Sequence, residues 1–264
     1  MTRVTSPDNP RLKEAARLIA SSRDRRKSGR CVLEGAHAID AYCRRIGHPE
    51  TLLVADDAEA DPAIAALMAR VPPSRTLTVT RAMLGELATL PADIGAIAVI
   101  DTPVAAPAPA GDFCLLLEDV QDPGNVGSML RSAAAAGVGQ AYLSRDCAFA
   151  WSPKVLRAAQ GAHFHLAIYE NVELVAWSQE FRRDGGTVMA TVVRGGVPLF
   201  DAALPRKLAL AIGNEGAGLT PALADAADLR VTIPMPGGTE SLNAAVAAAI
   251  CLFERVRRRG LFTG

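Results

Sequence analysis

The sequence predicts an α/β fold divided into two domains. Short runs of β-branched and aliphatic residues alternate with helix-length segments along the 264 residues, a pattern typical of sheets joined by helical crossovers. Half of the residues are hydrophobic, so the chain can bury a sizeable core. Residues 101–112 contain three prolines and no apolar periodicity. We therefore predict a linker at residues 102–112, between domains at residues 1–101 and 113–264.

The first domain alternates between helices and strands from its beginning. Asn9 and Pro10 favour the start of a helix that reaches about residue 21, because Pro is well tolerated at the first helical position. The basic stretch that follows, residues 22–30, predicts a loop. The rest predicts strands at residues 31–33, 51–54, 76–79 and 96–100, and helices at residues 36–46, 61–69 and 81–89.

The second domain opens with a buried strand at residues 113–117 and a turn at residues 122–124. Asn125, Ser152 and Ser241 are good N-caps and predict three helix starts, and Gly137 ends the first of these helices. Thr220 and Pro221 start a short helix. The remaining segments predict strands at residues 141–144, 163–168, 187–192, 208–212 and 229–233, and helices at residues 171–183 and 242–259.

Three loops of the second domain combine bare backbone with polar side chains. They follow predicted strands at residues 117–127, 213–219 and 233–243, and parallel sheets bind ligands at the carboxyl ends of their strands. A pocket with glycine-flanked backbone suits a flat, polar heterocycle held by main-chain hydrogen bonds. The loops and the first helix supply the candidate site residues Asn125, Arg131, Glu215, Ser241 and Asn243.

The sequence lacks the motifs of several other kinds of site, namely nucleotide-binding loops, nucleophilic catalytic sets and metal sites. The glycines of residues 213–218 do not have the Gly-x-Gly-x-x-Gly spacing of a dinucleotide fold, and no P-loop occurs. No Cys–His or Ser–His–Asp set is present, and Glu215 lacks a second carboxylate for paired acid–base work. The four histidines predict no metal site; His163 and His165 alternate along a predicted strand without a third ligand.

The cysteines and the apolar runs of the sequence indicate the cellular compartment in which the protein works. The five cysteines form no Cys-x-x-Cys pair, and Cys31, Cys114 and Cys251 lie in apolar runs typical of small core residues. The polar, basic start of the chain is no signal peptide, and no apolar run is long enough to span a bilayer. We expect a cytoplasmic protein that has no membrane segment.

Basic residues are concentrated locally, although the formal net charge is +0. An uneven cluster of cations on a neutral protein favours contact with a polyanion, and the alternative is a solvated helix face. We assign RNA binding to cations of the N-terminal arm and of the helix after Ser152, namely Arg11, Lys13, Arg25, Arg26, Lys27, Lys154 and Arg157.

Three stretches together resemble the signature motifs of the SpoU (TrmH-type) RNA ribose 2′-O-methyltransferases. They are residues 122–131 (DPGNVGSMLR), residues 212–219 (IGNEGAGL), and residues 233–243 (IPMPGGTESLN), in the order and near the spacing of that family. Residues 152–164 resemble the family segment that follows the first motif. Residues 1–101 are more loosely similar to the L30e-like substrate domain that precedes many such catalytic domains.

The resemblance implies a parallel-sheet SPOUT domain with a deep trefoil knot, a homodimer, and S-adenosylmethionine as the cofactor. The dimer would complete the active site, and the closing helix, with Val246, Ala249, Ile250 and Phe253 on one side, would be its surface. The alternative for that helix face is core packing. The cofactor would contact Thr191, Gly213, Glu215, Gly218, Ile233, Met235, Ser241, Leu242 and Asn243.

Arg131 is the residue that we expect to carry the chemistry. Its pKa is too high for ordinary general-base work, so we expect a buried guanidinium that holds an RNA phosphate and stabilises the developing alkoxide of a ribose hydroxyl. Asn125 would orient Arg131 or the ribose, and Glu215, Ser241 and Asn243 would complete the contacts. Ala134 and Ser152 depart from the family pattern, which weakens the substrate assignment more than the cofactor assignment.

Two other functions are open at this point. The chain could be a non-enzymatic RNA-binding or ribosome-assembly factor on the same fold, although the five polar site residues argue against that. It could be a nucleotide-dependent oxidoreductase, which the glycine spacing disfavours. As substrate, ribosomal RNA is favoured over transfer RNA because of the additional N-terminal domain.

Overall fold

The computed structural model describes residues 2–89 and 94–260, and they form two compact units. The first unit contains residues 1–104 together with residues 151–164, and the second contains residues 105–150 and 165–264. The boundary at residue 104 falls inside the predicted linker. Residues 151–164 differ from the prediction, which placed all of residues 113–264 in one domain. Their buried side chains, including Trp151, Val155 and Phe164, pack in the first unit.

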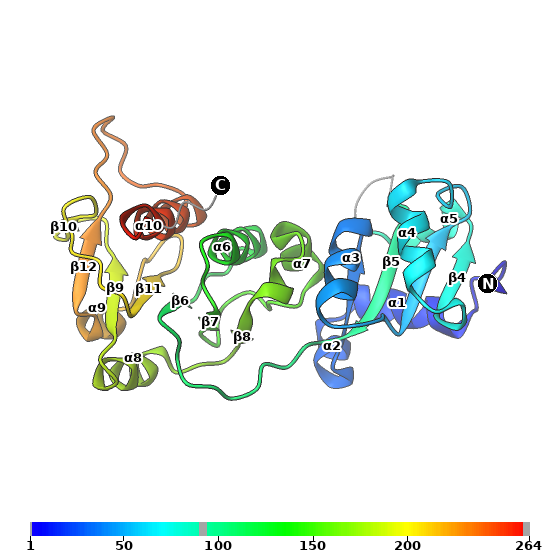
Figure 1. Cartoon of the computed structure of the whole chain (residues 1–264), viewed down its shortest axis with the longest axis horizontal. Coiled ribbons are helices and arrows are strands. Elements are labelled where there is room, and N and C mark those ends of the chain that lie inside the picture. The colour runs from blue at the N-terminus through cyan, green and yellow to red at the C-terminus, as the bar shows by residue number, and fades with distance from the viewer. Residues whose placement is uncertain (1, 90–93, 261–264) are drawn as a thin grey trace. The chain divides into compact units, whose positions relative to one another are not determined.

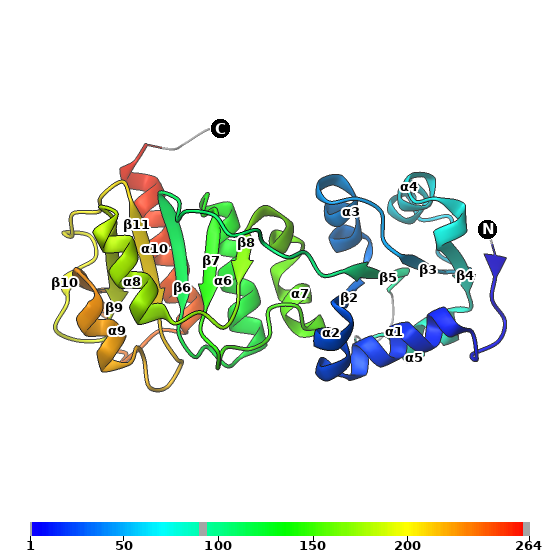
Figure 2. The ribbon, with the colours of Figure 1, turned by 90° about the horizontal axis from the view of Figure 1, so that it is seen from below.

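The first unit is built on a five-stranded sheet in the order β1-β4-β3-β5-β2. Strands β1, β3 and β4 run parallel, whereas β5 is antiparallel to both β3 and β2. Helices α3 and α4 cover one face, and α1 and α5 the other (Figures 1 and 2). The strands are β1 (Thr2–Arg3), β2 (Arg30–Glu34), β3 (Thr51–Ala55), β4 (Thr76–Val79) and β5 (Ala96–Asp101). The helices are α1 (Pro10–Ala20), α2 (Ser22–Ser28), α3 (Ala36–Arg45), α4 (Pro62–Arg70), η1 (Pro73–Arg75), α5 (Arg81–Leu87) and α7 (Pro153–Ala159).

Residues 22–28 form helix α2, so the predicted loop over residues 22–30 is wrong. The Ser21 side chain caps α2 by accepting a hydrogen bond from the Asp24 amide, and Gly29 ends the helix in the left-handed region. Arg25 points inward from this helix and is only 6% exposed. Its guanidinium donates to the carbonyls of Leu18 and Ile19 at the end of α1. The Ser21 cap, the Gly29 helix end and the buried Arg25 together explain a helix in a stretch whose polar sequence predicted a loop.

Helix α7 lies against β2 of the first unit, and Gly161, just beyond the helix, lies against α3. Ser152 caps it and Pro153 is its first residue, as predicted. Gly161 follows with a φ of +84°, and a Cβ atom there would lie 2.8 Å from Cβ of Ala41 on α3. Residues 162–165 form the 3₁₀ helix η2 (Ala162–His165), so the predicted strand alternation of His163 and His165 is wrong.

The second unit is a seven-stranded parallel sheet in the order β10-β12-β9-β11-β6-β7-β8. Helices α6 and α10 lie on one face, and α8 and α9 lie on the other (Figures 1 and 2). The strands are β6 (Phe113–Leu117), β7 (Gln140–Leu143), β8 (Ala167–Tyr169), β9 (Thr187–Thr191), β10 (Val197–Pro198), β11 (Leu208–Ile212) and β12 (Leu229–Thr232). The helices are α6 (Pro123–Ala135), α8 (Leu174–Arg183), α9 (Pro221–Ala226) and α10 (Ala244–Arg258).

Both units have apolar interiors that the sequence pattern anticipates. Strands β6 and β11 are buried along their whole length, because helices cover both faces of the sheet. Cys31, Cys114 and Cys251 are at most 1% exposed, which confirms them as core residues. Burial raises the pKa of each of these thiols to about 12. They are therefore protonated and unreactive at neutral pH. Among the described residues, no helix is long and apolar enough to cross a membrane.

Candidate active site

Four neighbouring parallel strands bring the three polar loops to one edge of the second sheet. Strands β12, β9, β11 and β6 are adjacent in that order. Ile212 pairs with Leu117, and Val231 pairs with Thr191, so the strands end nearly level with one another. The loops that follow β6, β11 and β12 therefore start side by side, and Thr191 lies at the end of the strand between two of them.

The turn after β11 is closed so tightly that its first residue must be glycine. A Cβ atom on Gly213 would lie 2.2 Å from the carbonyl carbon of Gly218. Asn214 and Gly218 exchange backbone hydrogen bonds of 3.0 and 2.9 Å across the turn. The Asn214 side chain also accepts from the amides of Gly216 and Ala217. The backbone of this turn is thus fixed before any ligand binds.

A pocket of about 230 Å³ opens beside this turn. Its wall combines backbone of the 213–218 turn with apolar side chains from β11, β12 and α10, such as Ile212, Val231 and Ala247. That mixture suits a flat heterocycle with hydrogen-bonding edges. Of the predicted cofactor contacts, those that line the pocket are Thr191, Gly213, Glu215, Gly218, Ile233, Met235, Ser241 and Leu242, whereas Asn243 is outside it.

Glu215 joins the turn after β11 to the loop after β6. Its carboxylate accepts hydrogen bonds from the backbone amides of Gln121 and Asp122 at 3.3 and 3.1 Å. It also accepts one from Nδ2 of Asn125 at 2.9 Å. All three donors lie at the start of α6, where the helix dipole further favours a negative charge. Glu215 therefore holds the start of the helix that carries Arg131.

These hydrogen bonds keep Glu215 ionised. Partial burial opposes ionisation, but the bonds from Asn125 and from the backbone outweigh it and lower the pKa below the ordinary value of 4.5. A carboxylate that is already the acceptor of three donors, with a lowered pKa, is poorly suited to take a proton at neutral pH. Its role in the site is to position the loop.

Asn243 connects the third loop to the same group. Its Nδ2 donates to Oδ1 of Asn125 at 2.9 Å. Its own Oδ1 caps α10 by accepting from the amides of Ala245 and Val246. A chain of side chains therefore runs from Glu215 through Asn125 to Asn243 and links all three predicted motifs. These three residues are far apart in the sequence, so the sequence analysis did not predict that their side chains bond to one another.

Two predicted helix caps are wrong, for a common reason. Asp122, not Asn125, caps α6 by accepting from the Asn125 amide at 2.8 Å. Asn243, not Ser241, caps α10. Helix α6 begins at Pro123 and helix α10 begins at Ala244. The cap is in each case the residue immediately before the helix, because its side chain can reach the second or third backbone amide of the helix. Asn125 is thereby free to bond Glu215, and Ser241 faces the pocket.

Arg131 is exposed, so the expected buried guanidinium is wrong for the single chain. The buried side of α6 consists of Val126, Met129, Leu130 and Ala133, and Arg131 lies away from it. Arg131 is six residues beyond Asn125, about 9 Å further along the helix axis. Within the described part of the chain its guanidinium makes no hydrogen bond or ion pair, so it is available to an anion.

Several residues that shape the site were missed by the sequence analysis. Glu118 is only 7% exposed, and its carboxylate accepts from the backbone amide and hydroxyl of Thr220 at 2.7 and 2.8 Å. Asn214 donates to the carbonyl of Asp119, whose φ of +54° places it in the left-handed region. These contacts add further links between the β6 and β11 loops. Glu118, Asp119 and Asn214 are polar residues that directly follow buried strands or lie within a motif, and this position is the sequence signal by which they could have been predicted.

The predicted RNA-binding cations have different surroundings. Arg25 is buried and bonded to backbone carbonyls, so it is unable to contact RNA and its assignment is wrong. Arg11 donates to the carbonyl of Ser74, and Lys13 pairs with Asp8. Apart from Arg25, all the predicted cations are open to solvent, fully or in part: Arg11, Lys13, Arg26, Lys27, Lys154 and Arg157.

Comparison with known proteins gives consistent matches over most of the chain. The profile of the SpoU rRNA Methylase family matches residues 112–253. A 23S rRNA (guanosine(2553)-2′-O)-methyltransferase of Bacillus subtilis is 32% identical over 96% of this chain and 98% of its own length. A crystal structure of an RNA 2′-O ribose methyltransferase superposes with a TM-score of 0.85, 31% identity, and coverage of 98% of this chain and 99% of the other.

A second solved structure adds information on the ligand of such proteins. It is the SpoU methyltransferase AviRb from Streptomyces viridochromogenes in complex with the cofactor AdoMet. It matches with a TM-score of 0.82 and 30% identity, and it covers 95% of this chain and 98% of its own. The similarity therefore extends through both units and not only through the profile-matched part.

Gly213→Ala is expected to destabilise the protein by about 1–3 kcal/mol, because the added methyl group overlaps backbone that has no room to move. Gly216→Ala is the matched control: its Cβ atom would be 3.7 Å from the nearest side-chain atom, and it should change stability little. Thermal unfolding of both variants checks the prediction. Equal melting temperatures for the two variants would contradict the close approach at Gly213.

Glu215→Gln is expected to cost about 1 kcal/mol at neutral pH, because exposed charge-assisted hydrogen bonds are lost. Since the folded-state pKa of Glu215 is lowered, the wild-type advantage exists above the ordinary value of 4.5 and disappears as the pH falls through the folded pKa. Denaturant unfolding across this pH range measures it. Glu240→Gln, on an exposed loop residue, is the control; a difference between wild type and Glu215→Gln that does not narrow in acid would contradict the assignment.

Proposed function

Because the chain belongs to the SpoU rRNA methylase family, we propose that it methylates a ribose 2′-hydroxyl of ribosomal RNA with S-adenosylmethionine as the methyl donor. The observation that carries the proposal is the Glu215–Asn125–Asn243 chain of hydrogen bonds beside the pocket. It assembles all three family motifs into one site, which a fold kept only for RNA binding would not require. The B. subtilis relative supports ribosomal RNA as the substrate.

The pocket residues fit the cofactor by their chemistry. The turn after Gly213 offers to an adenine edge the backbone carbonyls that its internal hydrogen bonds do not use, while Ile233, Met235 and Leu242 offer apolar contacts to its faces. Ser241 supplies a hydroxyl on the same wall. S-adenosylmethionine, when bound, supplies an electrophilic sulfonium methyl group. Because that methyl group is already reactive, the protein chiefly has to align the hydroxyl with it.

Arg131 is the residue that acts on the substrate in this proposal. The Arg131 guanidinium is charged at any physiological pH, so it binds a phosphate and lowers the energy of the alkoxide that forms as the 2′-hydroxyl loses its proton. Asn125 and Glu215 position α6 and thereby Arg131. Asn243 fixes Asn125 from the opposite loop. Exposure of Arg131 in one chain agrees with a site that is completed by RNA and by a second copy.

Arg131→Ala is expected to retain S-adenosylmethionine binding and to lower methyl transfer at least about a hundredfold, because one preorganised charge contact is lost from the transition state. Calorimetry measures cofactor binding, and transfer of radiolabelled methyl groups to ribosomal RNA measures turnover. Arg145→Ala, on an exposed loop arginine after β7, is the control. Turnover near the wild-type rate in Arg131→Ala would remove Arg131 from the mechanism. Failure of the wild type to bind the cofactor would overturn the proposed function itself.

We extend to this chain the homodimer expected of the family. Helices α6 and α10 lie on the same face of the sheet (Figures 1 and 2), and on α10 Val246 and Phe253 are 48% and 46% exposed. Large apolar side chains at that exposure favour an interface. Ala249 and Ile250 between them are partly buried. A second copy on this face would cover the apolar residues and lie beside α6, the helix that presents Arg131.

We also extend to it the knotted topology of the family. Strand β10 pairs with β12, and Arg258 of α10 donates to the carbonyls of Leu199, Phe200 and Ala202 just after β10. The C-terminal helix is thereby held against the segment through whose loop it would be threaded.

Val246→Glu with Phe253→Glu is expected to convert a dimer into a monomer, because two charges would be desolvated in an apolar contact. Analytical ultracentrifugation measures the mass in solution. Thr239→Glu with Glu240→Gln, on the exposed loop before α10, is a control that leaves that helix face unchanged. A wild-type protein that sediments as a monomer at micromolar concentration would refute the dimer.

A further inference from the structure

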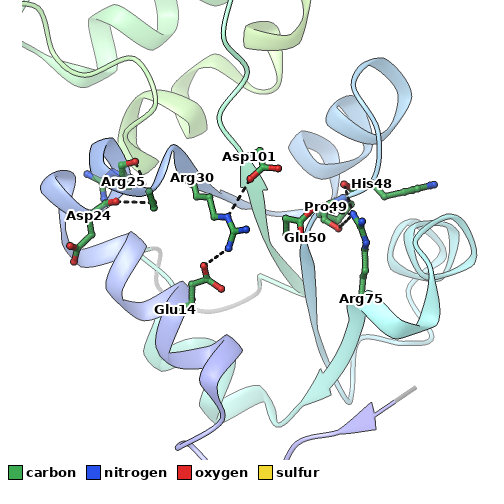
Figure 3. Close-up of polar contacts among 10 residues, drawn as sticks. Glu14, Asp24, Arg25, Arg30, His48, Pro49, Glu50, Arg75 and Asp101 are labelled. Carbon is green, nitrogen blue, oxygen red and sulfur yellow. Dashed lines mark hydrogen bonds and ion pairs between the residues drawn. The ribbon is translucent and has the colours of Figure 1, made fainter.

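The cations of the first unit divide into two groups by their partners. On the elements remote from β2, each described cation has a carboxylate partner: Arg3 with Asp56, Arg70 with Asp40, Arg75 with Glu50, and Arg81 with Asp57. Figure 3 shows such pairing for Arg75, and for Arg30 with Glu14 and Asp101. These charges are neutralised locally and contribute little to attraction of a polyanion.

A second group lacks carboxylate partners. Within residues 2–89 and 151–164, the cations that are at least partly exposed and have no carboxylate contact are Arg11, Arg17, Arg23, Lys27, Arg45, Lys154 and Arg157, of which Arg11 donates to the carbonyl of Ser74. They lie on α1, α2, α3 and α7, and all four of these helices pack against β2. Strand β2 is an edge strand of the five-stranded sheet. Uncompensated positive charge is therefore concentrated around one edge.

Helix α7 places charge on this edge from a distant part of the sequence. It packs against β2, and its buried residues include Val155, Leu156 and Ala159, whereas Lys154 is exposed and Arg157 partly so. Arg25 is buried from the other side, in α2, which leaves Arg23 and Lys27 turned to solvent. The two helices thus present cations outward for the same reason, namely that their apolar or bonded faces are used in packing.

We propose that the β2 edge of the first unit, formed by α2 and α7 with the end of α1, is the surface that binds the phosphate backbone of the RNA substrate. Unpaired, exposed Lys and Arg side chains are the groups that neutralise phosphates and release counterions. This inference deepens the proposed function and depends on it for the identity of the polyanion. It keeps Lys27, Lys154 and Arg157 from the set expected from the sequence, adds Arg23, and removes Arg25.

The test compares charge-matched double variants. Arg23→Gln/Lys27→Gln removes the α2 cations, and Lys154→Gln/Arg157→Gln removes the α7 cations. Arg3→Gln/Arg70→Gln is the control, because it removes the same formal charge from ion-paired positions on β1 and α4. The probe is a fluorescently labelled RNA hairpin transcribed from 23S rRNA, and anisotropy titrations over a series of salt concentrations give the affinity and its salt slope.

Each test variant is expected to bind roughly tenfold more weakly at 0.1 M salt and to reduce the salt slope by about 1.4 to 1.8, since each phosphate contact contributes about 0.7–0.9. The control should keep the wild-type slope. Equal losses in test and control variants would overturn the proposal, and so would wild-type slopes in both test variants.

Calorimetry with S-adenosylmethionine on the same proteins distinguishes failure of this proposal from failure of the proposed function. Absence of cofactor binding in the wild type would refute the methyltransferase function. Selective loss of RNA affinity in the test variants would support the RNA-binding surface whether or not the cofactor binds.

Discussion

The site depends on one carboxylate, that of Glu215, which fixes the loop after β6 against the turn after β11. Glu215 is at the turn after β11 and bonds two backbone amides and the Asn125 side chain at the start of α6. Those donors would otherwise be unpaired at a helix start, where the backbone amides have no partner within the helix. An acceptor from a different strand satisfies them, so the orientation of α6 is set by β11. The contact fixes the start of α6, and burial of Val126, Met129, Leu130 and Ala133 fixes which side of the helix carries Arg131.

The second constraint is steric and acts on the same turn. Gly213 approaches Gly218 so closely that no side chain fits between them, and the bonds across the turn leave its amides and carbonyls in a fixed arrangement. The pocket wall is therefore rigid backbone, while its other side comes from the loop before α10, which has few internal bonds.

Much of this arrangement was predictable because local signals and burial agree. Strands β6 and β11 coincide with the predicted residues 113–117 and 208–212, since fully buried strands are continuous apolar runs. Glycines and polar residues of the three loops marked the pocket. The failures have a physical cause in tertiary contacts: Arg25 stabilises α2 by bonding α1, and Asn125 is drawn to Glu215 instead of capping its helix. Exposure of Arg131 depends on which side of α6 is packed, which neither composition nor spacing determines.

Helix α7 has a consequence for how this polypeptide could be divided. The chain passes from one unit to the other near residues 104, 150 and 164, so a cut in the proline-rich segment does not separate two self-sufficient pieces. A fragment beginning at residue 105 would carry Trp151, Val155 and Phe164 without the surroundings that bury them, and residues 1–104 alone would leave the edge of β2 uncovered. Recombination that exchanged only the N-terminal half between relatives would have to preserve the fit of Gly161 against Ala41. The N-terminal part of the chain and residues 151–164 are therefore structurally interdependent.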